Sequence, residues 1–298
     1  MGNCHVRFLG EGDGATRSPL PDKGRDRFSS FGFKKYTNGF KIDGRRLRLS
    51  GIGRVAVRWH RPLAGQIKTV RITRRAGLWY ACFACEVEAV PLATTGQEVG
   101  VDVGVASLLT QSDGKKVANP RWYRVEQRRL RVLQRRVSRR KKGSSNRRKA
   151  VLALQRQHER IGNRRKDFLN KLISGLIERY DRIALEDLRI TNMARNPHLA
   201  KSILDAGWGY LVEHLTSKAE EAGRVVCLVD PRYTSKSCSQ CGHVFESLSL
   251  SDRWIDCGCG LSIDRDHNAA INILKRAGQV RWGISLPVGG LPQKAAPF

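Results

Sequence analysis

Three acidic residues beside apolar stretches of the sequence could together hold a divalent cation. Asp102 ends the run EVGVD, Glu186 ends the run RIALE, and Asp266 stands just before a predicted C-terminal helix. A carboxylate in such a place is costly unless water or a cation solvates it, and three that converge would repel one another without a metal. Because Mg²⁺ prefers carboxylate oxygens and suits phosphate substrates, we predict a catalytic magnesium site. Taken singly, each acid is more simply explained as the cap of a helix or turn.

Four of the eight cysteines lie in one 22-residue window, with the spacing Cys238-x₂-Cys241 and Cys257-x-Cys259. Close cysteine pairs in a chain without a secretion signal indicate metal binding rather than disulfides. Four thiolates suit tetrahedral Zn²⁺, and a site with four protein ligands is structural. We predict that these four cysteines bind zinc. His243 is an alternative ligand, and unligated core cysteines are the competing explanation.

The positive charge of the chain is concentrated in two segments. Of the formal net charge of +28, residues 1–97 carry +11 and residues 121–166 carry +17, which leaves the rest close to neutral. Two strongly basic segments beside a neutral C-terminal half predict binding to a polyanion. A solubilising surface would tolerate either sign of charge, and no segment has the apolar face that an anionic membrane requires. We therefore expect nucleic acid as the partner.

The length and composition predict a folded protein, and the close cysteine pairs without a secretion signal predict that it is cytoplasmic. A chain of 298 residues with 40% hydrophobic residues can bury a core and suits one large or two modest domains. The sequence contains no run of eighteen apolar residues, so we predict no membrane span. The first residues lack the apolar region of a signal peptide.

The N-terminal third alternates apolar and basic residues in short runs separated by glycine. We expect residues 1–30, which have no periodicity, to be irregular. Residues 31–97 contain alternating runs such as RVAVR and TVRIT, which are typical of half-buried antiparallel strands. We interpret them as a small β-barrel with a cationic exterior.

The remaining sequence alternates predicted strands and helices. Over residues 98–277 this alternation indicates an α/β core. Two insertions interrupt it, a basic helical hairpin over 121–166 and the cysteine-rich ribbon over 234–262. The segment 278–298 is rich in glycine and proline, and we expect it to be disordered.

Several motifs resemble the TnpB (OrfB) family of transposon-encoded proteins. VGVDVGVASLLT and IALEDLRITNM resemble its first two RuvC motifs, and TSKSCSQCG, WIDCGCG and SIDRDHNAAINIL resemble its zinc ribbon and third motif. The resemblance covers about Gly24 to Gly278, and the DRDxNAA string beside a four-cysteine ribbon is specific. Family members have a further helical segment before and within the barrel, so the chain is expected to be short at its N-terminus by about one helical subdomain.

The resemblance implies an RNA-guided DNA endonuclease, often labelled a transposase, that is related to type V CRISPR effectors. It implies an RNase H-like RuvC core that cuts DNA, a wedge-like β-barrel that helps hold a guide RNA from the transposon end, and a structural zinc ion. The catalytic acids carried over are Asp102, Glu186 and Asp266, with Asp264 as the second choice for the third position. They would hold two Mg²⁺ ions about 3.5–4 Å apart for phosphodiester hydrolysis.

Two other functions are compatible with the sequence. A catalytically impaired or truncated nucleic-acid-binding remnant, or a repressor derived from the family, would keep the basic segments and the ribbon but lose the carboxylates. A transposase could join strands with an RNase H-like core, but in this family another protein is thought to move the element. The presence of all three acids favours the nuclease.

Overall fold

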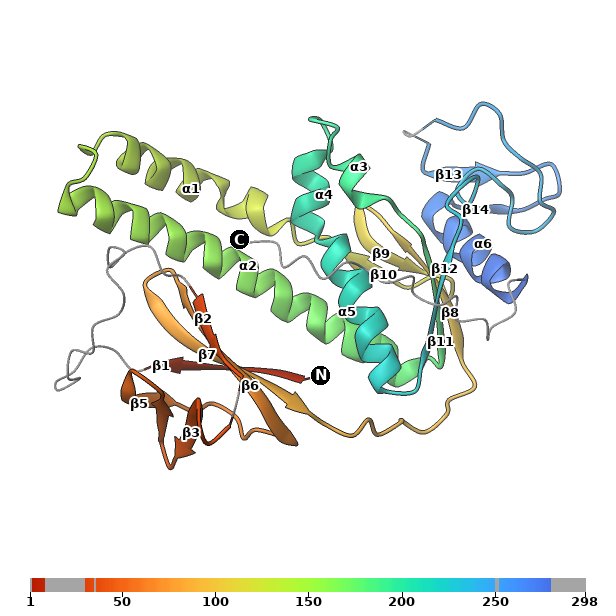
Figure 1. Ribbon diagram of the computed structural model, residues 1–298. Coiled ribbons are helices and arrows are strands. Elements are labelled where there is room, and N and C mark those ends of the chain that lie inside the picture. Colours follow the sequence, from red (N-terminus) through yellow and green to blue (C-terminus); the bar gives the residue numbers. More distant parts are fainter. Residues whose placement is uncertain (1, 9–29, 35, 250–251, 280–298) are drawn as a thin grey trace. The chain divides into compact units, whose positions relative to one another are not determined.

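The computed structural model describes most of the chain, and the described residues fall into two compact units (Figure 1). These residues are 2–8, 30–34, 36–249 and 252–279. The first unit comprises the described residues up to 89 together with 126–163, and the second comprises 90–125 together with the described residues from 164 onward. Each unit contains its own sheet. The domain boundaries predicted from the sequence remain predictions, because groups of close contacts need not fold independently.

The first unit contains a seven-stranded antiparallel sheet with the order β2-β6-β7-β1-β5-β4-β3. Its strands are β1 (Gly2–Phe8), β2 (Ser30–Phe33), β3 (Phe40–Asp43), β4 (Arg46–Leu49), β5 (Gly53–Arg58), β6 (Gln66–Arg75) and β7 (Leu78–Glu86). In β4, Leu47 and Leu49 are buried whereas Arg46 and Arg48 are exposed, because successive side chains of a strand point to opposite faces. The alternation that predicts this strand therefore also places its positive charge in solvent.

The N-terminal strand β1 departs from the expectation of an irregular segment over residues 1–30. It pairs with β7 along most of its length and with β5 over its last two residues. These pairings satisfy backbone groups directly, so the strand forms without the apolar alternation on which the prediction relies. Residues 9–29 lie outside the described residues. Closure of the sheet into a barrel remains a prediction, since the described pairings leave β2 and β3 at its edges.

The basic insertion forms a helical hairpin of α1 (Trp122–Ser138) and α2 (Ser145–Arg179). Its turn contains Gly143, whose φ of 81° is readily adopted by glycine. Arg147 closes the turn, because its Nη1 donates to the carbonyl oxygens of Val137 (2.7 Å) and Arg140 (3.2 Å). These contacts supply a side-chain donor at the end of α1, where a helix lacks backbone donors for its last carbonyls.

Helix α2 is one helix of 35 residues, about 50 Å long. The helical hairpin predicted from the sequence ends at residue 166, well before the end of α2. The segment GNRRKDF around this predicted end contains no proline, and a helix tolerates a single glycine such as Gly162 at modest cost. The helix therefore continues through this segment.

The second unit contains a five-stranded mixed sheet with the order β10-β9-β8-β11-β12. Its strands are β8 (Glu98–Val103), β9 (Ser107–Gln111), β10 (Lys116–Ala118), β11 (Arg182–Glu186) and β12 (Val225–Val229). Strands β8, β11 and β12 are parallel, whereas β9 and β10 are antiparallel to their neighbours. Strands covered on both faces read as unbroken apolar runs, which explains EVGVD and RIALE. The mixed α/β architecture expected here is present.

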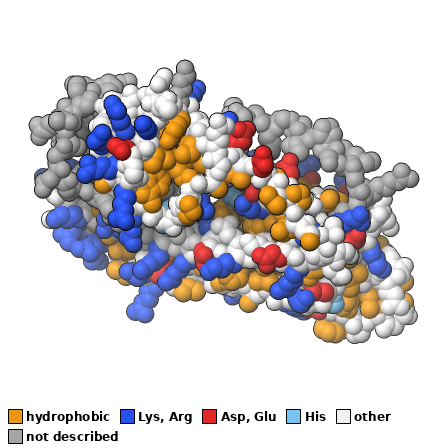
Figure 2. Space-filling model, turned by 90° about the horizontal axis from the view of Figure 1, so that it is seen from below, with side chains coloured by type: hydrophobic (Ala, Val, Ile, Leu, Met, Phe, Trp, Pro, Cys, Tyr) orange, Lys and Arg blue, Asp and Glu red, His pale blue; other side chains and the backbone are white. Residues whose placement is uncertain are grey.

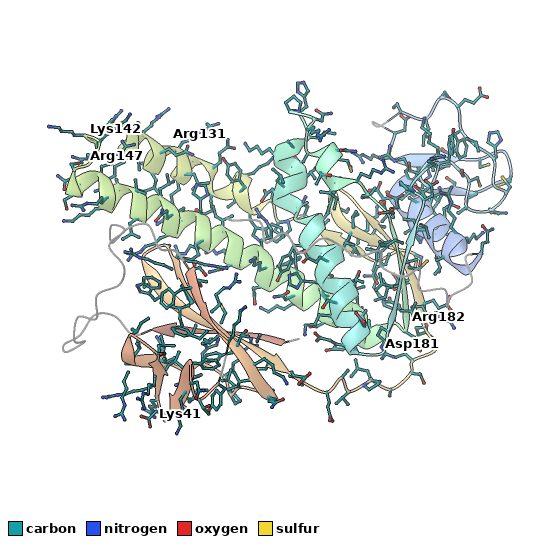
Figure 3. All side chains as sticks on the ribbon, in the orientation of Figure 1. Lys41, Arg131, Lys142, Arg147, Asp181 and Arg182 are labelled. Atoms are coloured by element: carbon teal, nitrogen blue, oxygen red, sulfur yellow. The ribbon has the colours of Figure 1, made fainter. Side chains whose placement is uncertain are left out.

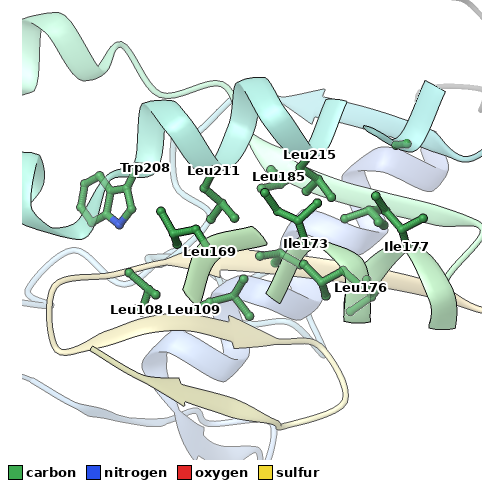
Figure 4. Close-up of a cluster of buried hydrophobic side chains, with 14 of the residues drawn as sticks. Leu108, Leu109, Leu169, Ile173, Leu176, Ile177, Leu185, Trp208, Leu211 and Leu215 are labelled. Carbon is green, nitrogen blue, oxygen red and sulfur yellow. The ribbon is translucent and has the colours of Figure 1, made fainter. Parts of the chain in front are cut away.

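Helices cover both faces of this sheet. On one face, Ile183 and Leu185 belong to the main core with side chains of α2 and of α5 (Trp208–Glu221) (Figure 4). On the other face, Ala184 packs with α6 (Arg265–Gln279). Helix α6 comes so close to β8 that a Cβ added to Gly100 would lie 2.0 Å from the carbonyl oxygen of Ala270. Glycine at this position thus allows α6 to pack directly on the sheet.

Four short elements complete the second unit, namely α3 (Ile190–Met193), α4 (Ala200–Ala206), β13 (Trp254–Asp256) and β14 (Ser262–Asp264). Strands β13 and β14 form an antiparallel pair within the cysteine-rich region. Of the tail that we expect to be disordered, the first two residues end α6 and the rest lies outside the described residues. Among the residues that the structure describes, no helix is both long and apolar enough to cross a membrane.

Candidate active site and cysteine cluster

Two of the predicted catalytic acids lie at the carboxyl ends of neighbouring parallel strands. Strand β8 pairs with β11 up to Val101 and Leu185, and the next residue of each strand is Asp102 and Glu186. Carboxyl ends of parallel strands meet at one edge of a sheet, where the sites of α/β proteins gather. The side chains of both acids are half-buried. Topology therefore joins two residues that are 84 positions apart in sequence.

The third predicted acid, Asp266, lies in the first turn of α6. Because α6 packs on β8 through Gly100, Asp266 contributes to the electrostatic potential at Asp102. The acids are more widely spaced than the cysteines. Among the described residues, the four cysteines are the one set of three or more candidate ligands whose ligand atoms all lie within 4.8 Å of one another.

The electrostatics of Asp102 favour a cation. Burial, then the negative charges of Glu186 and Asp266, raise the pKa of Asp102 from 3.8 to about 8, and the opposing effect of Arg265 is smaller. A carboxyl group in this state needs either a proton or a neighbouring positive charge. A divalent cation bound by three carboxylates would supply that charge, so this donor set suits the predicted metal.

Glu186 has a hydrogen-bond partner that the sequence did not reveal. The Oγ1 of Thr234 donates to Oε1 of Glu186. Burial raises the pKa of Glu186, while this hydrogen bond and the charge of Arg276 act in the opposite direction. Thr234 is the first residue of the motif TSKSCSQCG, and this position in the motif is the one feature of the sequence that could have identified it as a site residue.

Asp264, the second choice for the third acid, caps helix α6. Its Oδ1 accepts hydrogen bonds from the backbone N–H groups of Asp266 and His267, both at 3.1 Å, and its Oδ2 lies 2.7 Å from Nζ of Lys116. Burial would raise the pKa of Asp264, but the bonds from Lys116 and from the helix outweigh it and lower the pKa. Both oxygens of Asp264 are thus engaged, which favours Asp266 as the third acid.

The four cysteines of the ribbon converge as their spacing predicts. Cys238 and Cys259 have their Sγ atoms 3.7 Å apart, and those of Cys241 and Cys257 are 3.6 Å apart. With Zn–S bonds of about 2.3 Å, a tetrahedral site would separate its sulfurs by about 3.8 Å. The arrangement therefore fits a zinc ion. His243 is outside this group, and its ring packs instead against Phe245.

Each cysteine pair sits on a tight turn that ends in glycine. Gly242 donates its N–H to the carbonyl of Cys238, and Gly260 donates to that of Cys257, at 3.0 and 2.9 Å. Both glycines have positive φ values, 79° and 90°, which other residues adopt only with strain. Burial alone would raise the pKa of the Cys238 thiol, but backbone hydrogen bonds, first from Cys241, lower it to about 7. The turn that begins at Cys238 thus favours the thiolate form of this residue, which is the form that binds a metal.

Basic side chains cover the hairpin. Arg131, Lys142 and Arg147 are labelled in Figure 3, and every Lys and Arg between residues 128 and 149 is exposed except Arg147, which is half-buried where it closes the turn. On the face shown in Figure 2, Lys and Arg side chains outnumber Asp and Glu. The hairpin thus presents a positive surface.

Two family models match the chain. The model OrfB_IS605, described as a probable transposase, matches residues 82–197, and the model for the TNB domain of Cas12f1-like proteins matches residues 208–273. The first match contains Asp102 and Glu186, and the second contains the four cysteines and Asp266. The two matches together cover most of the second unit.

Similar proteins and structures agree with these models. The chain is 42% identical over 222 residues to a protein of Streptomyces pristinaespiralis, which covers 73% of the chain and 55% of the relative. It is 32% identical over 282 residues to InsQ of Escherichia coli (strain K12), which covers 88% of the chain and 70% of InsQ. Both relatives carry names that describe an RNA-guided DNA endonuclease.

The fold resembles that of Cas12f1 in a complex with guide RNA and target DNA. The TM-score is 0.52 at 17% identity, over 74% of this chain and 52% of Cas12f1. The chain therefore spans 52–70% of the length of these three proteins. Its identity to InsQ over most of both sequences, together with the OrfB model, shows that the chain belongs to the OrfB (TnpB) family of transposon-encoded proteins.

Proposed function

We propose that this protein is an RNA-guided DNA endonuclease that hydrolyses phosphodiester bonds at a RuvC-like site formed by Asp102, Glu186 and Asp266. The observation that carries the proposal is the convergence of these acids from β8, β11 and α6, with the ionisation of Asp102 opposed by the other two. A mixed sheet with acids at its carboxyl edge agrees with the RNase H-like core expected for the family. The names of the relatives supply the reaction class.

The three carboxylates would hold the catalytic metal, for which two Mg²⁺ ions are the expected form. Bound there, the ions would activate water and stabilise the leaving oxygen of the phosphodiester. Glu186 keeps one oxygen in the hydrogen bond with Thr234, and Asp264 fixes the start of α6 on which Asp266 stands. These hydrogen bonds hold one oxygen of Glu186 and the start of α6 in place.

The basic hairpin and the cationic strands of the first unit would hold the nucleic acid. Their exposed Lys and Arg side chains meet phosphates without regard to sequence. Sequence would be read by base pairing of a guide RNA from the transposon end, as in other guided nucleases. The four cysteines would hold a structural zinc ion, because no position of a four-cysteine site is left open for substrate.

The decisive experiment compares wild-type protein with Asp102→Ala. The full chain is purified from a host that carries the transposon, its bound RNA is sequenced, and matched DNA is offered with Mg²⁺. We expect a discrete RNA and Mg²⁺-dependent cleavage by the wild type. Asp102→Ala should lose cleavage by at least about 10³-fold while it keeps RNA and DNA binding, since it removes a metal ligand but no basic residue.

Asp167→Ala is the matched control. Asp167 is an exposed acid of α2 that pairs with Lys171 four residues later, so its loss should leave cleavage unchanged. Cleavage retained by Asp102→Ala would remove Asp102 from the site. A wild-type chain that carries no discrete RNA and cuts no DNA would contradict the proposal and favour a nucleic-acid-binding remnant.

A further inference from the structure

A buried polar network joins helix α6 to the segment that leads from β12 to the cysteines. Oδ1 of Asn268 accepts from the N–H of Ser239, and its Nδ2 donates to the carbonyl of Ser237, both at 2.7 Å. Nδ2 of Asn272 donates to the carbonyls of Thr234 (2.9 Å) and Ser237 (2.6 Å). Asn268, Asn272 and Thr234 are 0%, 8% and 2% exposed. A buried and satisfied network of this kind holds its members in one arrangement.

The network ends at a predicted catalytic acid. Thr234, whose carbonyl is fixed by Asn272, directs its Oγ1 toward Oε1 of Glu186 and toward the carbonyl of Pro231, which is 3.0 Å away. A hydroxyl group has one hydrogen to donate, and a carboxylate accepts a stronger bond than a neutral carbonyl. When Glu186 is ionised, the hydrogen therefore goes to Glu186.

We propose that Thr234 is a positioning residue, which fixes Oε1 of Glu186 so that Oε2 faces the divalent cation, and that the cysteine-bearing segment sets the place of Thr234 through Asn272. The inference rests on the proposed function, because it takes Glu186 as a metal ligand. Thr234 lies four positions before Cys238, and Asn268 and Asn272 hold both ends of that short segment against α6. The ribbon thus supports the carboxylate site directly.

Manganese binding by the full, zinc-loaded chain tests this role without any cleavage assay. Free Mn²⁺ is measured by electron paramagnetic resonance during a titration. Thr234→Val keeps the size of the side chain but loses the hydroxyl, and its dissociation constant for Mn²⁺ should rise about 10-fold or more, as for other partners of metal ligands. Thr234→Ser keeps the hydroxyl and should bind like the wild type.

Thr216→Val is the matched control. Its hydroxyl donates to the carbonyl of Val212 on the exposed side of α5, so its loss should leave Mn²⁺ binding unchanged. Wild-type affinity in Thr234→Val would overturn the inference, and so would an equal loss in Thr234→Ser, which would point to the methyl group. If Thr234→Val does not fold, Thr234→Ala is judged by the same standard.

Glu186→Gln separates this inference from the function on which it rests. If Glu186→Gln leaves Mn²⁺ affinity unchanged, the metal site itself is misassigned. If Glu186→Gln weakens binding but Thr234→Val does not, the nuclease proposal stands and the role of Thr234 fails.

Asn272→Leu tests the link to α6. It should weaken Mn²⁺ binding less than Thr234→Val does, and the double variant should bind no worse than Thr234→Val alone, because both changes act on the same contact. Additive losses would show that Asn272 does not act through Thr234.

Discussion

Acidic residues at the two ends of strand β11 have opposite environments. Asp181, which precedes the strand, accepts hydrogen bonds from the backbone of Thr95 and from Arg224, and these bonds, foremost that of Thr95, lower its pKa. Glu186 ends the strand beside Asp102. There, burial and the charge of Glu186 raise the pKa of Asp102 to about 8.

The difference separates a structural acid from a candidate catalytic one. An acid surrounded by donors is stabilised as an anion by the fold itself. An acid that is half-buried beside other acids has a raised pKa and needs a proton or a cation to neutralise it. Groups with strongly shifted pKa values are concentrated at functional sites. Position at the end of a strand does not distinguish the two, but the supply of hydrogen-bond donors does.

The largest effect on stability is expected from the loss of Arg224, which donates a hydrogen bond to Asp181. The side chain of Arg224 is 2% exposed, and it donates hydrogen bonds to Asp181 and to two backbone carbonyls. Arg224→Met should lower the free energy of unfolding by about 3 kcal/mol, because the backbone carbonyl oxygens of Ile177 and Ala93 both lose this donor. Urea unfolding measures the change. Arg182→Met is the control. Arg182, labelled in Figure 3, forms an exposed ion pair with Glu98 that should contribute less than about 1 kcal/mol. Equal losses in the two variants would contradict the special role of Arg224.

Gly100→Ala should disturb the edge of the sheet that carries Asp102 by moving α6. The new Cβ would meet the carbonyl oxygen of Ala270 at 2.0 Å, so the helix that carries Asp266 must shift away from Asp102. We expect a destabilisation of about 1–3 kcal/mol and loss of cleavage. Gly162→Ala, in α2 with no atom within 4 Å of the added Cβ, should instead stabilise by about 0.5–1 kcal/mol. Normal cleavage by Gly100→Ala would show that the site tolerates displacement of α6.

Asp102→Asn should abolish cleavage yet stabilise the zinc-loaded protein in a buffer that contains no Mg²⁺ or Mn²⁺. Substitution relieves the repulsion from Glu186 and Asp266, and we expect a gain of about 1–2 kcal/mol. Because the raised pKa destabilises the fold as pH rises from 3.8 toward 8, the gain should grow over that window and vanish below it. Urea unfolding at several pH values measures it. Loss of stability in Asp102→Asn would place Asp102 with Asp181 as a structural acid.

The smallest effect is expected for Asp181→Asn, in how the free energy of unfolding falls at acidic pH. A lowered pKa means that Asp181 stabilises the fold above its ordinary value of 3.8, and that this contribution is lost as pH falls through the still lower value of the folded state. The difference in stability between wild type and Asp181→Asn should therefore shrink between pH 5 and about pH 3. A difference that stays constant over this range would show that Asp181 titrates normally.

The sequence reveals local arrangements better than distant ones. The turn of Cys238 and Cys241 is formed by adjacent residues and ends at Gly242, so spacing alone locates the cluster. The runs EVGVD and RIALE indicate two acids at strand ends, and the parallel pairing of β8 and β11 then places these ends side by side. The catalytic role of these acids remains a prediction.

Other features depend on contacts that no local pattern records. The ion pair that engages the second oxygen of Asp264 joins it to Lys116, which is distant in sequence, and it forms only once β10 and α6 are in place. Thr234 and Glu186 are 48 residues apart, and their contact requires the packing of a loop on α6. Strand β1 is held by its neighbours rather than by its own periodicity, which is why a search for alternation misses it.

The hydrogen bonds of Arg147 at the turn of the hairpin affect how the affinity for nucleic acid will depend on ionic strength. Only cations that meet phosphates displace the counterions condensed on a nucleic acid, and each such contact steepens the fall of affinity with salt. Arg147 instead devotes its Nη1 to the carbonyls of Val137 and Arg140. A titration with salt should therefore report fewer phosphate contacts than the hairpin has positive residues, and neutralising Arg147 should change the rigidity of the turn more than the slope of that titration.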